Sequence, residues 1–304
     1  MLSQLGSYLV FFVATSTLLR LFLKYSLVLL ISYGSGYNKT MDKKLTPYKR
    51  SPRSRLGRAD LHIHSSYSDA QPTIEEILDY VENETDLDII AITDHDTIDG
   101  ALFAKQIMKK KKYRFELIIG EEISTKEGHL LGLFLDKAIP AKIDLHDAIL
   151  EIKKQNGLAI VPHAFQLTRM NNGKNVTMDG IGRTNLLREK RSVDGVEVIN
   201  ATPTLDQENI KATLINSTLV VQAEIGDSDA HILDAIGKAY TVFEGKTVQE
   251  LRSAIKKNQT KALHEKWALL ALVKYLFFFI PIGLRMFWYT IIHGIVRPKR
   301  TAKQ

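Results

Sequence analysis

The stretch LDIIAITDHDTIDGALFAKQIMKKKK, residues 87–112, contains a short apolar run, a polar turn and a helical pattern in succession. The run LDIIAIT is short and rich in β-branched residues, which is typical of a buried strand. From Thr97 onward, apolar side chains recur every three or four residues, which predicts a helix. A strand followed directly by a helix is the repeating unit of α/β proteins, so this stretch indicates the fold class.

The same succession continues from about Ala59 to Leu263. Further runs are typical of buried parallel strands: FELIIG, HLLGLFL, LAIVPH, VDGVEVIN and TLVVQAEIG. Helical patterns separate most of them: TIEEILDYVENE, DLHDAILEIKKQN, LDQENIKATLINS and TVQELRSAIKKN. Strand–helix repetition over some 200 residues predicts an α/β barrel or a doubly wound sheet.

Polar residues collect at the ends of these predicted strands. In ADLHIHSSYSD, residues 59–69, apolar and polar residues alternate, so both imidazoles of His62 and His64 project from one face of a strand. Six of the nine histidines fall at strand ends or starts: His62, His64, His95, His129, His163 and His231. The other three, on predicted helices, look ordinary: His146, His264 and His293. The carboxyl ends of parallel strands share one rim, so the six histidines are expected to converge there.

Carboxylates follow the same strands, and the concentration of polar groups points to cations. Asp69, Glu122 and Asp229 join the six histidines, and so many buried polar groups are costly unless something pairs them. The chain has no cysteine, so its ligands are nitrogen and oxygen atoms. A multinuclear metal site is therefore predicted.

The ordered motifs DLHIHSSYSD, AITDHDT, GEEIST with HLLGL, PHAF, VEVIN and SDAH resemble those of the polymerase and histidinol phosphatase (PHP) superfamily. The resemblance spans about Ala59 to Leu263 and includes IGKAYTVFEGKTVQELRSAIKKN after the last metal motif. It implies a distorted (β/α)7 TIM-like barrel that hydrolyses phosphate esters. Two or three divalent ions, commonly manganese, zinc or iron, are implied as cofactors.

Matching the motifs position by position implies three ligand groups. The first is His62, His64, Glu122 and Asp229, and Glu122 bridges to a second with His129 and His163. The third is Asp69, His95 and His231. The motif favours Glu122 over Glu121, because the ligand directly precedes the isoleucine. AQPT after Asp69 and Ala164 after His163 depart from the family pattern, but neither departure removes a ligand.

Catalytic roles follow from metal-activated water as the nucleophile. Asp69 or Asp229 is expected to orient that water or to carry its proton, and His231 is a candidate acid for the leaving oxygen. Arg169, with Arg183 as a second choice, is a candidate phosphate clamp, and both arginines are equally well explained as solvated loop residues. Asn200 is a candidate substrate-binding residue whose alternative role is to brace the rim.

The resemblance implies a nucleotide or oligonucleotide phosphate as substrate, of the nucleoside bisphosphate phosphatase or 5′-to-3′ exonuclease type. One alternative is a phosphatase of a lipid-linked or sugar phosphate, which apolar ends would favour. A non-catalytic metal-binding scaffold and a metal-dependent amidohydrolase are further alternatives. The intact ligand set disfavours the scaffold, and the DHDT and SDAH motifs disfavour the amidohydrolase.

The two ends differ from the rest of the chain. Residues 1–36 are apolar and interrupted by Arg20 and Lys24, so the segment either spans a membrane or lies at its surface. The linker 37–58 contains eight Lys/Arg and one Asp, and is expected to bind anionic lipid or to collect a polyanion. The predicted domain covers residues 59–263, and residues 264–304 after it form a second apolar segment with a basic tail, which predicts a membrane segment. The alternative interpretation of this segment is a buried amphipathic helix of a soluble domain. Membrane association with a cytoplasmic catalytic domain is predicted, the basic linker setting the orientation.

Overall fold

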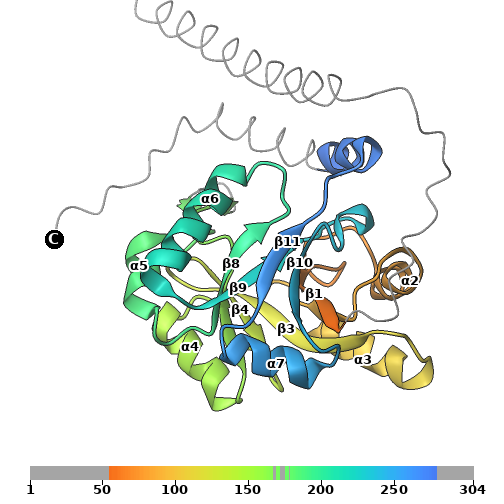
Figure 1. Ribbon diagram of the computed structural model, residues 1–304, viewed down its shortest axis with the longest axis horizontal. Coiled ribbons are helices and arrows are strands. Elements are labelled where there is room, and N and C mark those ends of the chain that lie inside the picture. Colours follow the sequence, from red (N-terminus) through yellow and green to blue (C-terminus); the bar gives the residue numbers. More distant parts are fainter. Residues whose placement is uncertain (1–54, 167–168, 172–174, 178, 279–304) are drawn as a thin grey trace, which may run out of the picture. The chain divides into compact units, whose positions relative to one another are not determined.

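The computed structural model describes residues 55–166, 169–171, 175–177 and 179–278 (Figure 1). The predicted membrane segment 1–36, residues 37–54 of the linker and residues 279–304 lie outside this described part. Within the described residues, no helix combines the length and the apolar character needed to cross a bilayer.

Nine strands form one sheet that nearly closes into a barrel. Their order across the sheet is β11-β10-β1-β2-β3-β4-β5-β8-β9, and all but β4 and β10 run in the same direction. The sheet folds back on itself, because Gly226 in the end strand β9 exchanges hydrogen bonds with the Thr241 hydroxyl in β10, the neighbour of the other end strand β11. The bounds are β1 (Leu56–Ile63), β2 (Ile89–Ile92), β3 (Glu116–Ser124), β4 (His129–Leu133), β5 (Leu158–Val161), β8 (Gly195–Asn200), β9 (Ala223–Asp227), β10 (Ala239–Glu244) and β11 (Lys261–His264). A separate hairpin pairs β6 (Arg169–Asn171) with β7 (Asn175–Thr177).

Helices surround the strands (Figure 1). Five confirm the predicted helical stretches: α2 (Ile74–Glu84), α3 (Asp99–Lys110), α4 (Leu145–Lys154), α6 (Asp206–Ile215) and α7 (Val248–Lys256). Thr73 and Thr247 cap α2 and α7 in capping boxes with Glu76 and Glu250. The helix α5 (Gly182–Glu189) was not predicted, and the shorter turns η1 (Asn216–Val220) and η2 (Leu233–Ala235) complete the set.

Three details of the strand prediction are wrong. The run HLLGLFL gives β4, which is antiparallel because residues 125–128 connect it to β3 as a short hairpin, and a parallel crossover needs a longer connection. In TLVVQAEIG the first part belongs to the π-helix η1, which is followed by Val221 in the left-handed region (φ 61°), so β9 begins only at Ala223. His264 lies in β11, where a helix was expected.

The barrel interior is filled by alternate residues from strands all round the sheet, among them Leu61, Ile118, Ile160 and Ile225. Two other clusters lie between strands and helices, and Ile63 belongs to one of them. Leu61 and Ile63 thus face opposite sides of β1 although two residues apart, because the pairing of β1 with β2 shifts register between Asp60 and Ile63. The shift directs His62 and His64 to the inside of the barrel end.

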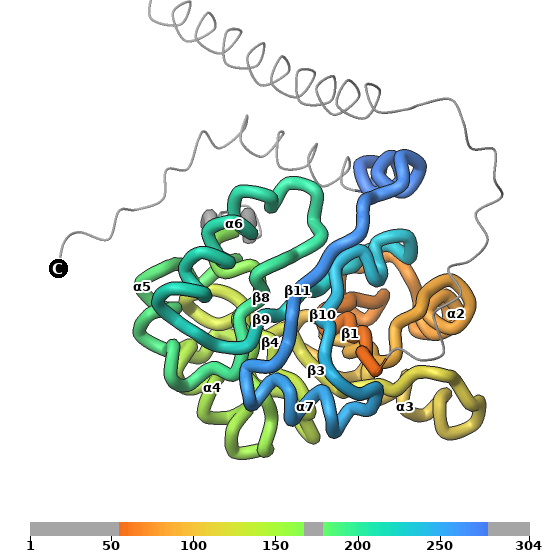
Figure 2. Tube along the Cα trace, viewed as in Figure 1, coloured from red at the N-terminus to blue at the C-terminus, as the bar shows by residue number. Residues whose placement is uncertain are grey.

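Residues 269–278, the blue coil beyond β11 in Figure 2, are helical. The indole N–H of Trp267 donates to the carbonyl of Ala201 at 2.9 Å, Tyr275 is buried, and Lys274 pairs with Asp234 at 2.8 Å. For residues 267–278, these contacts favour the alternative of a helix on a globular domain, but the helix is not buried as that alternative expected, since Leu270 and Phe277 are exposed. The predicted domain boundary at 263 falls inside β11.

Candidate metal centre

All nine predicted ligands lie together at one end of the barrel. They come from β1 and the loop after it, from β3 and β4, and from the segments that follow β2, β5 and β9: His62, His64, Asp69, His95, Glu122, His129, His163, Asp229 and His231. Their nitrogen and oxygen atoms form overlapping groups within 4.8 Å. How the nine are divided among ions stays a prediction.

The inner group is His62, His64, Glu122 and Asp229. The Nε2 atoms of the two imidazoles are 3.0 Å apart, and Oε2 of Glu122 lies 3.2 Å from one and 3.1 Å from the other. Oδ1 of Asp229 lies 3.5 and 3.4 Å from the same two nitrogens. Four ligands at about 2.0–2.2 Å from a tetrahedral ion are separated by about 3.3–3.6 Å. The inner group therefore has close to the spacing that one divalent ion requires.

The second oxygen of Glu122 faces a different pair of imidazoles. Oε1 lies 2.8 Å from Nδ1 of His129 and 2.9 Å from Nε2 of His163. Nδ1 of His95 lies 3.3 Å from Oε2, so His95 borders both Glu122 and the outer group described next. A carboxylate with each oxygen in a different nitrogen group has the arrangement of a bridging ligand.

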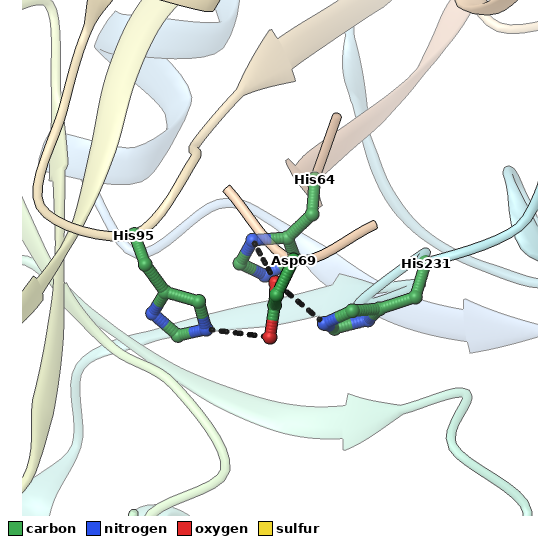
Figure 3. Close-up of side chains that lie close together, drawn as sticks. All are labelled: His64, Asp69, His95 and His231. Atoms are coloured by element: carbon green, nitrogen blue, oxygen red, sulfur yellow. Dashed lines mark ion pairs between the residues drawn. The ribbon is translucent and has the colours of Figure 1, made fainter. Parts of the chain in front are cut away.

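The outer group is His64, Asp69, His95 and His231 (Figure 3). Asp69 lies 3.2 Å from Nε2 of His231, 3.7 Å from Nε2 of His95 and 3.9 Å from Nδ1 of His64. The ring of His64 stacks on those of His231 and His95, with centroids 4.4 and 4.7 Å apart. The Asp69 side chain is 32% exposed, so this group forms the open side of the centre.

The electrostatics of the centre suit a cation. Burial alone would lower the pKa values of His62 and His64, because it disfavours their charged forms. The neighbouring carboxylates of Asp229 and Glu122 outweigh burial, so the pKa of His64 is raised to about 9 and that of His62 well above its ordinary value. Against the same burial, the imidazoles hold the pKa values of Glu122 and Asp229 well below their ordinary range. Burial lowers the pKa of His95 to about 3, which keeps that ring neutral. Because ligating imidazoles are neutral, binding of divalent ions here releases protons from His62 and His64.

Comparison with known proteins agrees with this geometry. The sequence profile of the PHP-associated family matches residues 223–260. An uncharacterized protein of Methanocaldococcus jannaschii is 39% identical over 119 residues, which cover 36% of this chain and 68% of that protein. The chain belongs to the PHP superfamily of metal-dependent phosphoesterases. As a member of this superfamily it is a hydrolase of phosphate esters.

One further relative and one solved structure are similar to this chain. The 5′-3′ exoribonuclease Rnm of Salmonella typhimurium is 32% identical over 137 residues, or 41% of this chain and 46% of that protein. The crystal structure of a two-domain protein from Bacteroides vulgatus, containing a predicted PHP-like metal-dependent phosphoesterase, superposes with a TM-score of 0.53 at 21% identity. The match covers 69% of this chain and 65% of that one, and it shows a shared fold.

Glu197 holds two of the histidines of the PHP centre in position, and it was not among the predicted site residues. It is buried, its Oε1 lies 3.2 Å from Nδ1 of His62, and its Oε2 accepts from the backbone N–H of His163 at 2.6 Å. A carboxylate on the far nitrogen of a ligating histidine fixes its tautomer and orientation. The signal in the sequence was the position of Glu197 at the end of a strand.

Asn200 braces the same carboxylate. Its amide donates to Oε2 of Glu197 at 3.0 Å and to Oδ2 of Asp229 at 3.1 Å, and its oxygen accepts from the Thr202 N–H. These contacts favour the bracing alternative over substrate binding.

The loop that carries Asp69 is held by Asp94. One carboxylate accepts from the backbone N–H and the hydroxyl of Ser65 and from the hydroxyl of Ser68, each at 2.7 Å. Below the centre, Asp227 accepts from the N–H of Leu61, and Asp60 accepts from the N–H of Ser228, so β1 and β9 are tied together beside their ligands. Burial raises the pKa of Asp60 to about 6.

The remaining predicted residues contribute less to the described geometry. Glu121 accepts from the N–H of Ile139 at 2.7 Å, whereas Glu122 contacts the imidazoles. Arg183 lies exposed in the first turn of α5. Arg169 is in β6, and its side chain lies outside the described part of the structure.

Proposed function

We propose that the chain hydrolyses the phosphate ester of a nucleotide or short oligonucleotide, using two or three manganese, zinc or iron ions. The observation that carries this proposal is the grouping of nine ligands in which Glu122 offers one oxygen to each of two nitrogen groups. The chemistry supplied by such ions is activation of water for attack on phosphorus and compensation of the phosphate charge. The similarity to a 5′-3′ exoribonuclease supports a nucleotide substrate.

Asp69 and His231 are suited to proton transfer at the open side. The backbone carbonyl of Asp229 only accepts, so Nδ1 of His231, 3.0 Å away, carries a hydrogen. Nε2 of His231 then faces Asp69, whose Oδ1 lies 3.2 Å away. His231 and its imidazole neighbours hold the pKa of Asp69 well below its ordinary value despite burial, so Asp69 is an acceptor at neutral pH.

The two roles proposed for His231 exclude each other at one atom. Nε2 either ligates an ion or donates a proton to the leaving oxygen, because a ligating nitrogen carries no hydrogen. His231→Gln separates them: a ligand role predicts loss of bound metal, whereas an acid role predicts intact metal content with loss of the alkaline limb of the pH–rate profile.

A lipid-linked or sugar phosphate is the second candidate. The observation that favours it is the exposed apolar side of helix 269–278, formed by Leu269, Leu270, Val273, Leu276 and Phe277. Membrane association of the apolar segments 1–36 and 264–304 is a related proposal that rests on their sequence, and vesicle flotation of the full chain tests it.

Hydrolysis by the full chain tests the function, measured as inorganic phosphate released from monoesters and as mononucleotides released from oligonucleotides. With manganese, the substrates are nucleoside monophosphates, a nucleoside 3′,5′-bisphosphate, short oligonucleotides, a sugar phosphate and phosphorylated lipids. Release from a nucleotide that chelator abolishes is the expected result. Release from the lipid or sugar ester alone selects the second candidate, and chelator-resistant release contradicts the metal mechanism.

A further inference from the structure

A pocket of about 540 Å3 opens next to the metal centre. Its walls come from three segments: the start of α2, the residues after His231, and helix 269–278. The members that matter below are Gln71, Leu233, Asp234, Lys274, Phe277 and Phe278. The volume is within the range of sites that bind small organic molecules.

The pocket is physically joined to the open side of the centre. The N–H of Gln71 donates to the carbonyl of His231 at 3.0 Å, and Asp69, two residues earlier, belongs to the outer ligand group. The ring of Phe278 lies 6.2 Å from that of His231, centroid to centroid, and also lines the pocket. A molecule whose phosphate reaches Asp69 therefore has its organic part within reach of this pocket.

The lining combines aromatic faces with polar groups. Phe277, which is 68% exposed, and Phe278 both present aromatic rings to the pocket. Lys274 and Asp234 form an ion pair within the same wall, and Gln71 adds an amide. Flat rings beside hydrogen-bonding groups suit a planar heterocycle, whose faces stack and whose edge carries donors and acceptors, better than an acyl chain, which has no polar edge.

We propose that Phe277 and Phe278 form the platform on which the nucleobase of the substrate stacks, while its phosphate lies at the Asp69 side of the metal centre. This inference rests on the proposed function and deepens it, because it gives helix 269–278 the role of selecting nucleotides over other phosphate esters. Lys274 and Gln71 are the groups placed to meet the edge of the base.

The test compares a nucleotide with the same ester lacking its base. The full-length variants Phe277→Ala and Phe278→Ala are assayed with manganese on AMP and on ribose 5-phosphate. The ratio of kcat/KM for AMP to that for ribose 5-phosphate is expected to fall about 5- to 150-fold, the equivalent of about 1–3 kcal/mol for one stacked base. Phe277→Trp, which keeps an aromatic ring at this position, is expected to retain the ratio of the unsubstituted chain. Leu270→Ala is the matched control, since Leu270 is 67% exposed on the same helix but does not line the pocket.

Calorimetric binding of AMP provides a readout independent of turnover. Weaker AMP binding in both phenylalanine variants, with unchanged AMP binding in Leu270→Ala, supports the platform. This holds even if the chain releases no phosphate, because the absence of phosphate release refutes the proposed function and not the platform. An unchanged ratio with normal AMP turnover, or an equal loss on both esters, overturns the platform and leaves the phosphoesterase function standing.

Discussion

Glu197→Gln is predicted to weaken metal binding by changing the tautomer of His62. In the structure Oε2 of Glu197 accepts two hydrogens, from the N–H of His163 and the amide of Asn200. The single oxygen of glutamine is therefore required at that position, and its NH2 group comes to lie at the position of Oε1, 3.2 Å from Nδ1 of His62. Nδ1 must then accept, which moves the ring proton to Nε2.

Nε2 of His62 is the atom that faces the inner ligand group, and a protonated nitrogen cannot ligate. Loss of such a supporting partner typically costs 10- to 100-fold in metal affinity, or about 1.4–2.7 kcal/mol. The concentration of manganese that gives half-maximal phosphate release is expected to rise by that factor, with partial recovery at saturating manganese. Calorimetric titration of the metal-free protein with manganese measures the same change directly.

The matched control is Glu189→Gln. Glu189 is also buried and also pairs with Nδ1 of a histidine, His146, at 3.0 Å, but on the outside of the barrel. The Glu189→Gln variant should need a manganese concentration for half-maximal activity within about twofold of that of the unsubstituted chain. An unchanged requirement in Glu197→Gln, or the same shift in the control, would refute the tautomer argument.

The remaining predictions concern catalysis, metal and stability. Asp229→Asn keeps the shape of the side chain but removes the charge beside His62 and His64, so turnover at saturating manganese should fall about 10²–10⁴-fold. A loss of turnover below tenfold would exclude a role for Asp229 in metal binding or proton transfer. Manganese at about 100 times its dissociation constant should add about 2.7 kcal/mol per ion to the free energy of unfolding, so chelator should lower the melting temperature, and an unchanged melting temperature would argue against bound metal. Thr247→Ala removes the cap of α7 and should cost about 0.5–2 kcal/mol in urea unfolding without changing the manganese requirement.

The position of the metal centre was predictable because it depends on a general property of the fold. Strands that run in one direction end on the same rim, so polar residues after β2, β5 and β9 converge however far apart they are in the sequence. The alternation in β1 likewise predicted that His62 and His64 share a face, and their Nε2 atoms are 3.0 Å apart. These inferences needed only strand identity and direction, whereas the inward direction of His62 and His64 depends on the register shift between Asp60 and Ile63.

Features that depend on local irregularity were not predictable. The pairing of β8 with β9 shifts register between Glu197 and Ile199, and strand periodicity carries no sign of such a shift. The direction of β4 depends on a four-residue turn in place of a crossover. Helix 269–278 is apolar on the side packed against the barrel and on the side exposed to solvent, so its sequence fits a membrane segment as well as a docked helix.

The way in which ligands are shared decides how substitutions in the centre should be interpreted. Glu122 offers its two oxygens to different nitrogen groups, and His64 presents Nε2 to the inner group and Nδ1 to Asp69 in the outer one. The three groups are therefore mechanically and electrostatically connected, and removing either shared residue disturbs two of them at once. Residues that act as one unit have non-additive effects, so losses measured for single ligands do not sum to the contribution of the centre. Asp69 and His231, at the open side and away from Glu122, are the residues whose substitution best separates handling of the substrate from retention of metal.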